Sequence, residues 1–102
     1  MDRLGMLQKM VVAKPDEAFP RYGLAMELKK LGREAEAEAA FVELAARIPS
    51  YVPCYLMHGN LLEAMGRPED AVGVYTRGIE VAEAASDDHA VSELQAARDA
   101  LA

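Results

Sequence analysis

The sequence predicts an all-α fold in which about six helices form antiparallel hairpins within one domain, residues 1–102. Apolar residues recur at spacings of three and four, as at Leu24, Leu28 and Leu31, which is the period of a helix with one buried face. The chain also resembles itself when it is shifted by 34 residues. A period of that length indicates stacked copies of one supersecondary unit. Hydrophobic residues make up 52% of the chain and charged residues 27%, so a folded module is expected.

The internal repeat pairs residues of similar size and character. Gly32 pairs with Gly66, and Phe41 pairs with Tyr75. The other pairs are Ala25 with Gly59, Leu28 with Leu62, Arg33 with Arg67, Ala37 with Ala71, Leu7 with Phe41, Met10 with Leu44 and Pro15 with Pro49. Each unit therefore reads as two helices that are divided by a glycine.

Prolines and glycines place the ends of the first four helices. Pro15 and Pro49 stand just after a helix, where a residue that cannot continue the hydrogen-bond ladder is tolerated. Pro20 and Pro53 mark helix starts, and Gly32 can take the left-handed conformation that ends a helix at low cost. The helices expected from these signals span residues 2–13, 18–31, 34–47 and 52–65.

Two further helices complete the chain. Gly66 ends the fourth helix, and Pro68 suits the first turn of a fifth helix at 68–84. A sixth helix is expected at 87–101, where one face carries apolar residues and the other is acidic. The apolar face holds Val91, Leu94, Ala97 and Leu101, and the acidic face holds Asp88, Glu93 and Asp99. This pattern is typical of a capping helix.

The two units resemble the tetratricopeptide-repeat (TPR) signature, in which an aromatic residue, a Leu-Gly pair, a tyrosine, an alanine, a phenylalanine and a proline follow at fixed spacings. The second unit matches it at Tyr55, Gly59, Leu62, Ala71 and Tyr75, with His58 in the leucine slot. The first unit matches it at Leu24, Ala25, Leu28, Ala37, Phe41 and Pro49. Arg21 takes the aromatic slot of the first unit, with Tyr22 beside it.

The resemblance implies a short right-handed superhelix of stacked helix hairpins. It divides the chain into an N-terminal half-repeat helix, two full repeats and a C-terminal capping helix, at residues 1–15, 16–50, 51–85 and 86–102. In this family the first helix of each repeat lines a concave groove that binds a peptide or a helix. The resemblance places in that groove Tyr22, Met26, Lys29 and Lys30 from the first repeat and Leu56, Asn60 and Glu63 from the second.

These residues imply a non-catalytic module that binds another protein, whose identity the sequence does not give. The alternative interpretation of Met26 and Leu56 is that they are ordinary core residues. Some members of the family grip the C-terminal carboxylate of chaperones with lysines in this groove. Tyr22 and Leu56 replace the expected lysines, and only Asn60 matches, so chaperone-tail binding is not expected.

The N-terminal helix suggests a second function, self-association. Leu4, Met6 and Met10 contribute to more apolar surface than one neighbouring helix can cover. A structural homo-oligomerisation module, such as a homodimer formed through this helix, is therefore the alternative function. The competing interpretation is that the methionines pack on Leu24, Leu28 and Phe41.

Other function classes find no support in the sequence. Cys54 and His58 lie four residues apart and give at most half of a metal site, so no metal, cofactor or catalytic residue is expected. The net charge of −6 lies in the second half of the chain and disfavours nucleic acid as a partner. No apolar run is long enough to span a membrane, and the start of the chain does not resemble a signal peptide, so a cytoplasmic location is expected.

Overall fold

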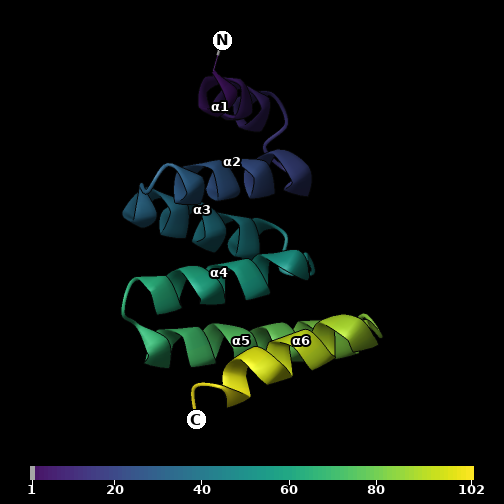
Figure 1. Ribbon diagram of the computed structural model, residues 1–102. Helices are drawn as coiled ribbons and strands as arrows, with labels where there is room; N and C mark the ends of the chain where they lie inside the picture. The colour runs from purple at the N-terminus through teal and green to yellow at the C-terminus, as the bar shows by residue number, and fades with distance from the viewer. Residues whose placement is uncertain (1) are drawn as a thin grey trace. The chain divides into compact units, whose positions relative to one another are not determined.

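The computed structural model describes residues 2–102, which form six α-helices and no strand (Figure 1). The helices are α1 (Arg3–Ala13), α2 (Ala18–Lys30), α3 (Glu34–Arg47), α4 (Pro53–Ala64), α5 (Pro68–Ala84) and α6 (Asp88–Asp99). The all-α prediction is confirmed, and every expected helix end lies within two residues of the observed one. Among the described residues, no helix combines the length and the apolar character that crossing a membrane requires.

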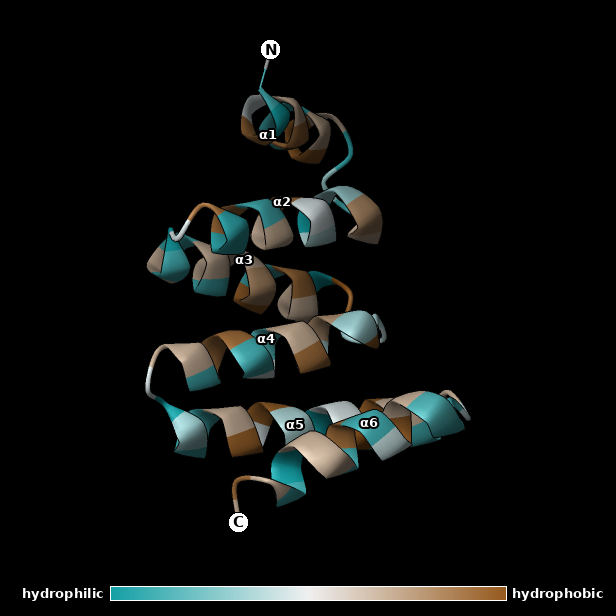
Figure 2. Cartoon of the chain, viewed as in Figure 1, coloured by the Kyte–Doolittle hydropathy of each residue, from teal (hydrophilic) through white to brown (hydrophobic). Residues whose placement is uncertain are grey.

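The chain forms two compact units, and each has its own core. The N-terminal unit, Met1–Ile48, holds α1, α2 and α3, with α1 packed on α2 and α2 packed on α3. Its fully buried side chains include Ala25, Ala37, Phe41 and Leu44. Figure 2 shows that hydrophobic residues alternate with hydrophilic ones along the helices, as amphipathic helices require.

The C-terminal unit, Pro49–Ala102, holds α4, α5 and α6. α5 packs on both α4 and α6, and α6 also touches α4. The core of this unit includes Tyr55, Leu61, Leu62, Tyr75 and Leu94, each at most 2% exposed. α6 buries Leu94 and leaves Asp88, Glu93 and Asp99 exposed, so its apolar and acidic faces lie as the sequence pattern predicts.

One turn geometry recurs three times along the chain. Gly32 and Gly66 have φ angles of 76° and 74°, and the residue after each donates its backbone N–H back across the helix end. Arg33 N–H donates to Leu28 O at 3.0 Å, and Arg67 N–H donates to Leu62 O at 2.9 Å. These are the 6→1 hydrogen bonds of the Schellman motif. The third copy joins α5 to α6 and has Ser86 at the left-handed position, with φ 56°.

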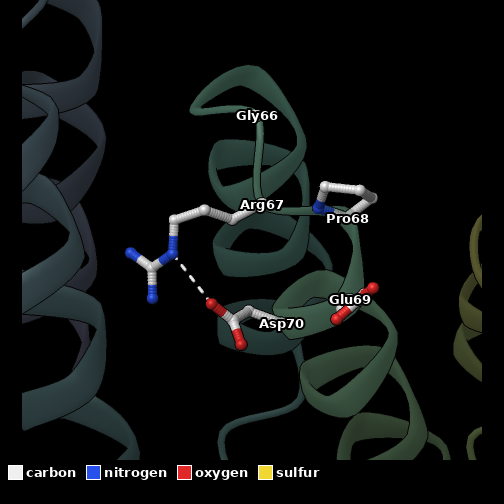
Figure 3. Close-up of a pocket in the computed structure, with 5 residues that line it drawn as sticks. All are labelled: Gly66, Arg67, Pro68, Glu69 and Asp70. Carbon is white, nitrogen blue, oxygen red and sulfur yellow. Dashed lines mark hydrogen bonds and ion pairs between the residues drawn. The ribbon is translucent and has the colours of Figure 1, made fainter.

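In each of the first two turns, the arginine that follows the glycine binds an acidic residue of the next helix. Arg33 binds Glu36 through two hydrogen bonds of 2.8 Å, and Arg67 Nε donates to Asp70 at 2.8 Å. Figure 3 shows Arg67 and Asp70 facing one another across the start of α5, beside a hollow of about 290 Å3. The acidic residues lie in the first turn of α3 and of α5, where the helix dipole also favours them.

Small residues allow the helices of the C-terminal unit to approach closely. A Cβ added to Gly59 on α4 would lie 2.1 Å from Tyr75 Cε1, and one added to Gly78 on α5 would lie 2.5 Å from Tyr55 Cβ. Both distances are shorter than any real contact, so these two positions accept only glycine without a shift of the neighbours. Close packing here sets where the polar end of Tyr75 lies.

Candidate functional site

The α2 part of the candidate site lies in the N-terminal unit. Tyr22, Met26 and Lys29 follow one another at spacings of four and three, so they share one face of the helix. All three are half-buried, whereas Lys30 is exposed. Met26 is therefore not a fully buried core residue, and part of its side chain is open to a partner.

The α4 part of the candidate site lies in the C-terminal unit and has the same spacing. Leu56 and Asn60 are half-buried, and Glu63 is exposed. The three residues share one face of α4, since they are separated by four and three positions. This face presents an apolar side chain at one end and a carboxylate at the other.

A buried tyrosine from α5 organises the polar end of this α4 face. The hydroxyl of Tyr75 lies 2.7 Å from Asn60 Oδ1 and is also hydrogen-bonded to Glu63 Oε2. Burial is the main cause that raises the pKa of Tyr75 above its usual range, and the hydrogen bond to Glu63 and the charge of that carboxylate raise it further. The phenol therefore stays protonated at neutral pH and acts as a donor. The sequence identifies Tyr75 only as the counterpart of Phe41 in the second repeat and gives no sign of these hydrogen bonds.

The position before Tyr22 shows a substitution that preserves a hydrogen bond. Tyr55 donates its hydroxyl to Pro49 O at 2.5 Å in the second repeat. Arg21, which takes the equivalent slot 34 residues earlier, donates its Nε to Pro15 O at 2.6 Å. The two prolines are also equivalent in the repeat. An arginine therefore replaces the usual aromatic residue here and still holds the chain that precedes the helix.

Cys54 and His58 are both buried in the core of the C-terminal unit. Burial raises the pKa of the Cys54 thiol to about 12, so at neutral pH the thiol stays protonated and lacks the thiolate that nucleophilic attack requires. Within residues 2–102, no three His, Cys, Asp or Glu side chains lie close enough together to hold a metal ion. The buried His58 fills the slot that the repeat signature gives to leucine.

The outer surface of α1 is a second candidate site. Met6 is 45% exposed, Met10 is 36% exposed and Val12 is 83% exposed, while Leu4 is half-buried. Leu7 is the one buried residue of this helix, so α1 rests on α2 by a narrow face. A hollow of about 410 Å3 lies on the surface of α1 and is lined by Gly5, Gln8, Lys9, Val12 and Ala13.

Solved structures of repeat proteins align with most of this chain. The solution structure of a tetratricopeptide repeat domain protein from Salinibacter ruber is 39% identical, covers 86% of this chain and 89% of its own, and has a TM-score of 0.82. A crystal structure of a tetratricopeptide repeat domain protein from the same organism is also 39% identical, with 83% of this chain and 96% of that chain covered and a TM-score of 0.78.

A more distant structure has the same fold. The solution structure of a protein from Bordetella parapertussis is 20% identical, covers 99% of this chain and 88% of its own, and has a TM-score of 0.83. No protein-family model matches the sequence, and no curated protein matches it. The identity of 39% to the Salinibacter ruber protein, over most of both chains, therefore carries the comparison.

Proposed function

Because the chain belongs to the tetratricopeptide-repeat family, we propose that it binds a peptide or a helix of another protein with the first helix of each repeat, α2 and α4. Family membership supports a protein-interaction module in general, since this repeat fold is typically non-catalytic. The choice of surface rests on one observation. On each of these helices, a row of three side chains at spacings of four and three stays outside the buried core.

The two rows are Tyr22, Met26 and Lys29 on α2 and Leu56, Asn60 and Glu63 on α4. Each row offers a large apolar side chain and a polar one, which is the combination that anchors a peptide and fixes its orientation. Met26 adds a flexible side chain that can adapt to the shape of a guest. Lys30 lies beside the α2 row and is exposed.

Affinity capture followed by mass spectrometry tests the proposal. A protein retained by the wild-type chain is expected to be lost with Tyr22→Ala or Leu56→Glu, while circular dichroism shows the same helical signal. Val42→Glu on α3 is the matched control, because Val42 is 51% exposed and lies outside both rows. Capture that survives both test variants, or that Val42→Glu also abolishes, would contradict a site on α2 and α4.

Self-association through α1 is the second candidate function, favoured by the exposure of Met6 and Met10. The two exposed methionines lie on one face of α1 and form an apolar surface that a helix facing only solvent would not need. Sedimentation equilibrium at rising concentration is expected to show a dimer that Met6→Glu or Met10→Glu dissociates. A mass that stays monomeric into the high micromolar range would rule this candidate out.

A further inference from the structure

The polar end of the α4 face has more hydrogen-bond acceptors than donors. Glu63 offers two carboxylate oxygens and Asn60 offers Oδ1, while the hydroxyl of Tyr75 supplies one proton to the group. If the Asn60 amide turned over, its N–H would donate to Tyr75, yet Glu63 would still receive a single hydrogen bond from the described residues. Because Glu63 is exposed, its remaining acceptor positions face solvent and are open to a donor from outside the chain.

The first repeat shows that this arrangement is not needed for the fold. A shift of 34 residues places Phe41 at the position of Tyr75, Met26 at that of Asn60 and Lys29 at that of Glu63. Phe41 is fully buried as Tyr75 is, so the ring fills the same space in both repeats. The hydroxyl, the amide and the carboxylate are thus an addition to the second repeat, and the charge at the last position is reversed.

The surrounding charge favours a cation at this place. The N-terminal unit has eight acidic and eight basic residues, whereas the C-terminal unit has nine acidic residues and three arginines. The potential over the C-terminal unit is therefore negative and attracts basic groups. Lysine and arginine have three and five N–H donors and no acceptor, which matches the surplus of acceptor oxygens at Asn60 and Glu63.

We propose that Asn60 and Glu63 form a subsite for a basic side chain of the bound peptide, and that Tyr75 is the positioning residue of this subsite. The inference rests on the proposed function of α4 as part of a peptide-binding surface. The basic side chain donates to the Glu63 carboxylate and to Asn60 Oδ1. Tyr75 holds both acceptors together from the buried side and does not itself contact the peptide.

The spacing on α4 also sets the register of the peptide. Leu56 and Glu63 are seven residues apart on a helix, so their Cα atoms lie about 10 Å apart along its axis. A peptide in the polyproline II conformation advances about 3.1 Å per residue with three residues per turn, so side chains three residues apart lie on the same face and about 9 Å apart. The peptide that fits α4 therefore carries an apolar residue and a basic residue separated by two others.

Fluorescence anisotropy with matched synthetic peptides tests the subsite. One six-residue peptide has leucine and arginine three residues apart, and a second has glutamine in place of the arginine. The arginine peptide is expected to bind the wild-type chain about five- to tenfold more tightly, because an ion pair with hydrogen bonds replaces a neutral contact. Glu63→Gln should bring this ratio close to one.

Two further variants separate the roles of the residues. Tyr75→Phe keeps the ring and is expected to lower the ratio to about two- or threefold, because Asn60 and Glu63 are no longer held together. Leu56→Ala should weaken both peptides equally and leave the ratio unchanged. A purely structural role of Tyr75 would likewise weaken both peptides and would not change the ratio.

The outcomes distinguish the inference from the proposed function. Equal binding of the two peptides, or a ratio that Glu63→Gln leaves unchanged, would overturn the basic subsite while binding that depends on Leu56 supports the surface. If neither peptide binds, or if both bind and Leu56→Ala leaves their affinity unchanged, the proposed surface on α4 is wrong.

Discussion

Gly59 is the residue that lets Tyr75 reach the outer face of α4. An added Cβ would lie 2.1 to 2.6 Å from three atoms of the tyrosine ring, and that ring is fully buried. The equivalent residues of the first repeat are Ala25 and Phe41, which lack both the extra space and the hydroxyl. Glycine and tyrosine therefore occur together in the repeat that contains the hydrogen-bonded acceptors.

We expect Gly59→Ala to lower the free energy of unfolding by about 1–3 kcal/mol, because the methyl group forces the ring out of its packed position. Urea unfolding measures the change. Gly73→Ala is the matched control, since Gly73 lies inside α5 and an added Cβ meets no atom within 4 Å. That variant should gain about 0.5–1 kcal/mol from the better helix propensity of alanine. Equal effects of the two substitutions would contradict the role of close packing.

At the scale of the element, the turn after α5 has a serine at the left-handed position where the other two turns have glycine. Ser86 has φ 56°, a conformation that Gly32 and Gly66 adopt at the equivalent points of the other two hairpins. Its neighbour Asp87 donates its backbone N–H to Ala82 O at 2.9 Å and so completes the same motif. The side chain of Asp87 also accepts from Ala90 N–H and caps α6.

Ser86→Gly is therefore expected to raise the free energy of unfolding by about 0.5–1 kcal/mol, because a residue with a Cβ is strained at this φ. Gly66→Ala should lower the free energy of unfolding by about 1 kcal/mol. This cost comes only from the strained backbone conformation, since an added Cβ meets nothing within 4 Å. Thermal unfolding followed by circular dichroism measures both. A loss of stability in Ser86→Gly would show that the hydroxyl matters more than the backbone.

The attachment of α1 depends on few interactions. Leu7 is 3% exposed and reaches the surface of Gly23 on α2, where an added Cβ would lie 2.9 Å from Leu7 Cδ2. Arg3 Nε also lies 3.3 Å from Glu27 Oε1, between α1 and α2. The arginine of this pair is 59% exposed and the glutamate 11%, so the pair is partly open to solvent and contributes less than the apolar contact of Leu7.

Leu7→Ala should release α1 with a local loss of about 2–4 kcal/mol. Hydrogen exchange detected by NMR is expected to show faster exchange throughout α1, while α5 keeps its protection. Val12→Ala serves as the comparison, because Val12 is 83% exposed and its loss should change stability by less than about 0.5 kcal/mol. Uniform loss of protection in all helices would mean that α1 unfolds only with the rest of the chain.

The helices could be predicted from the sequence because the apolar periodicity and the glycines and prolines that end helices are local features. The 34-residue shift, Gly32 and Gly66 were enough to place the elements. The hydrogen bonds of Tyr75 could not be predicted in the same way. Periodicity assigns a residue to a buried face, but the reach of a long side chain depends on how close the neighbouring helix comes, and Gly59 sets that distance. The match between Arg21 and Tyr55 as donors likewise required the positions of the proline carbonyls.

At the scale of the whole molecule, the charge is divided unequally between the two units. The N-terminal unit is neutral by residue count, and its ion pairs include Arg33 with Glu36 and Arg47 with both Glu43 and Asp16. The C-terminal unit carries the whole net charge of −6. The excess acids include Glu80 and Glu83, which are exposed near the end of α5. α5 has no basic residue in its last turn to offset them.

Repulsion within the C-terminal unit should make stability depend on salt. The screening length falls from about 30 Å at 0.01 M salt to about 8 Å at 0.15 M, so like charges along α5 repel one another less. We expect the melting temperature to rise over this range. The double variant Glu80→Gln/Glu83→Gln should be more stable than the wild type at 0.01 M salt by about 0.5–1 kcal/mol, because it removes a like-charge pair and a carboxylate at the negative end of a helix dipole. Its melting temperature should also respond less to salt. If salt instead lowers the stability of the wild type, the ion pairs of the N-terminal unit outweigh the repulsion in the C-terminal unit.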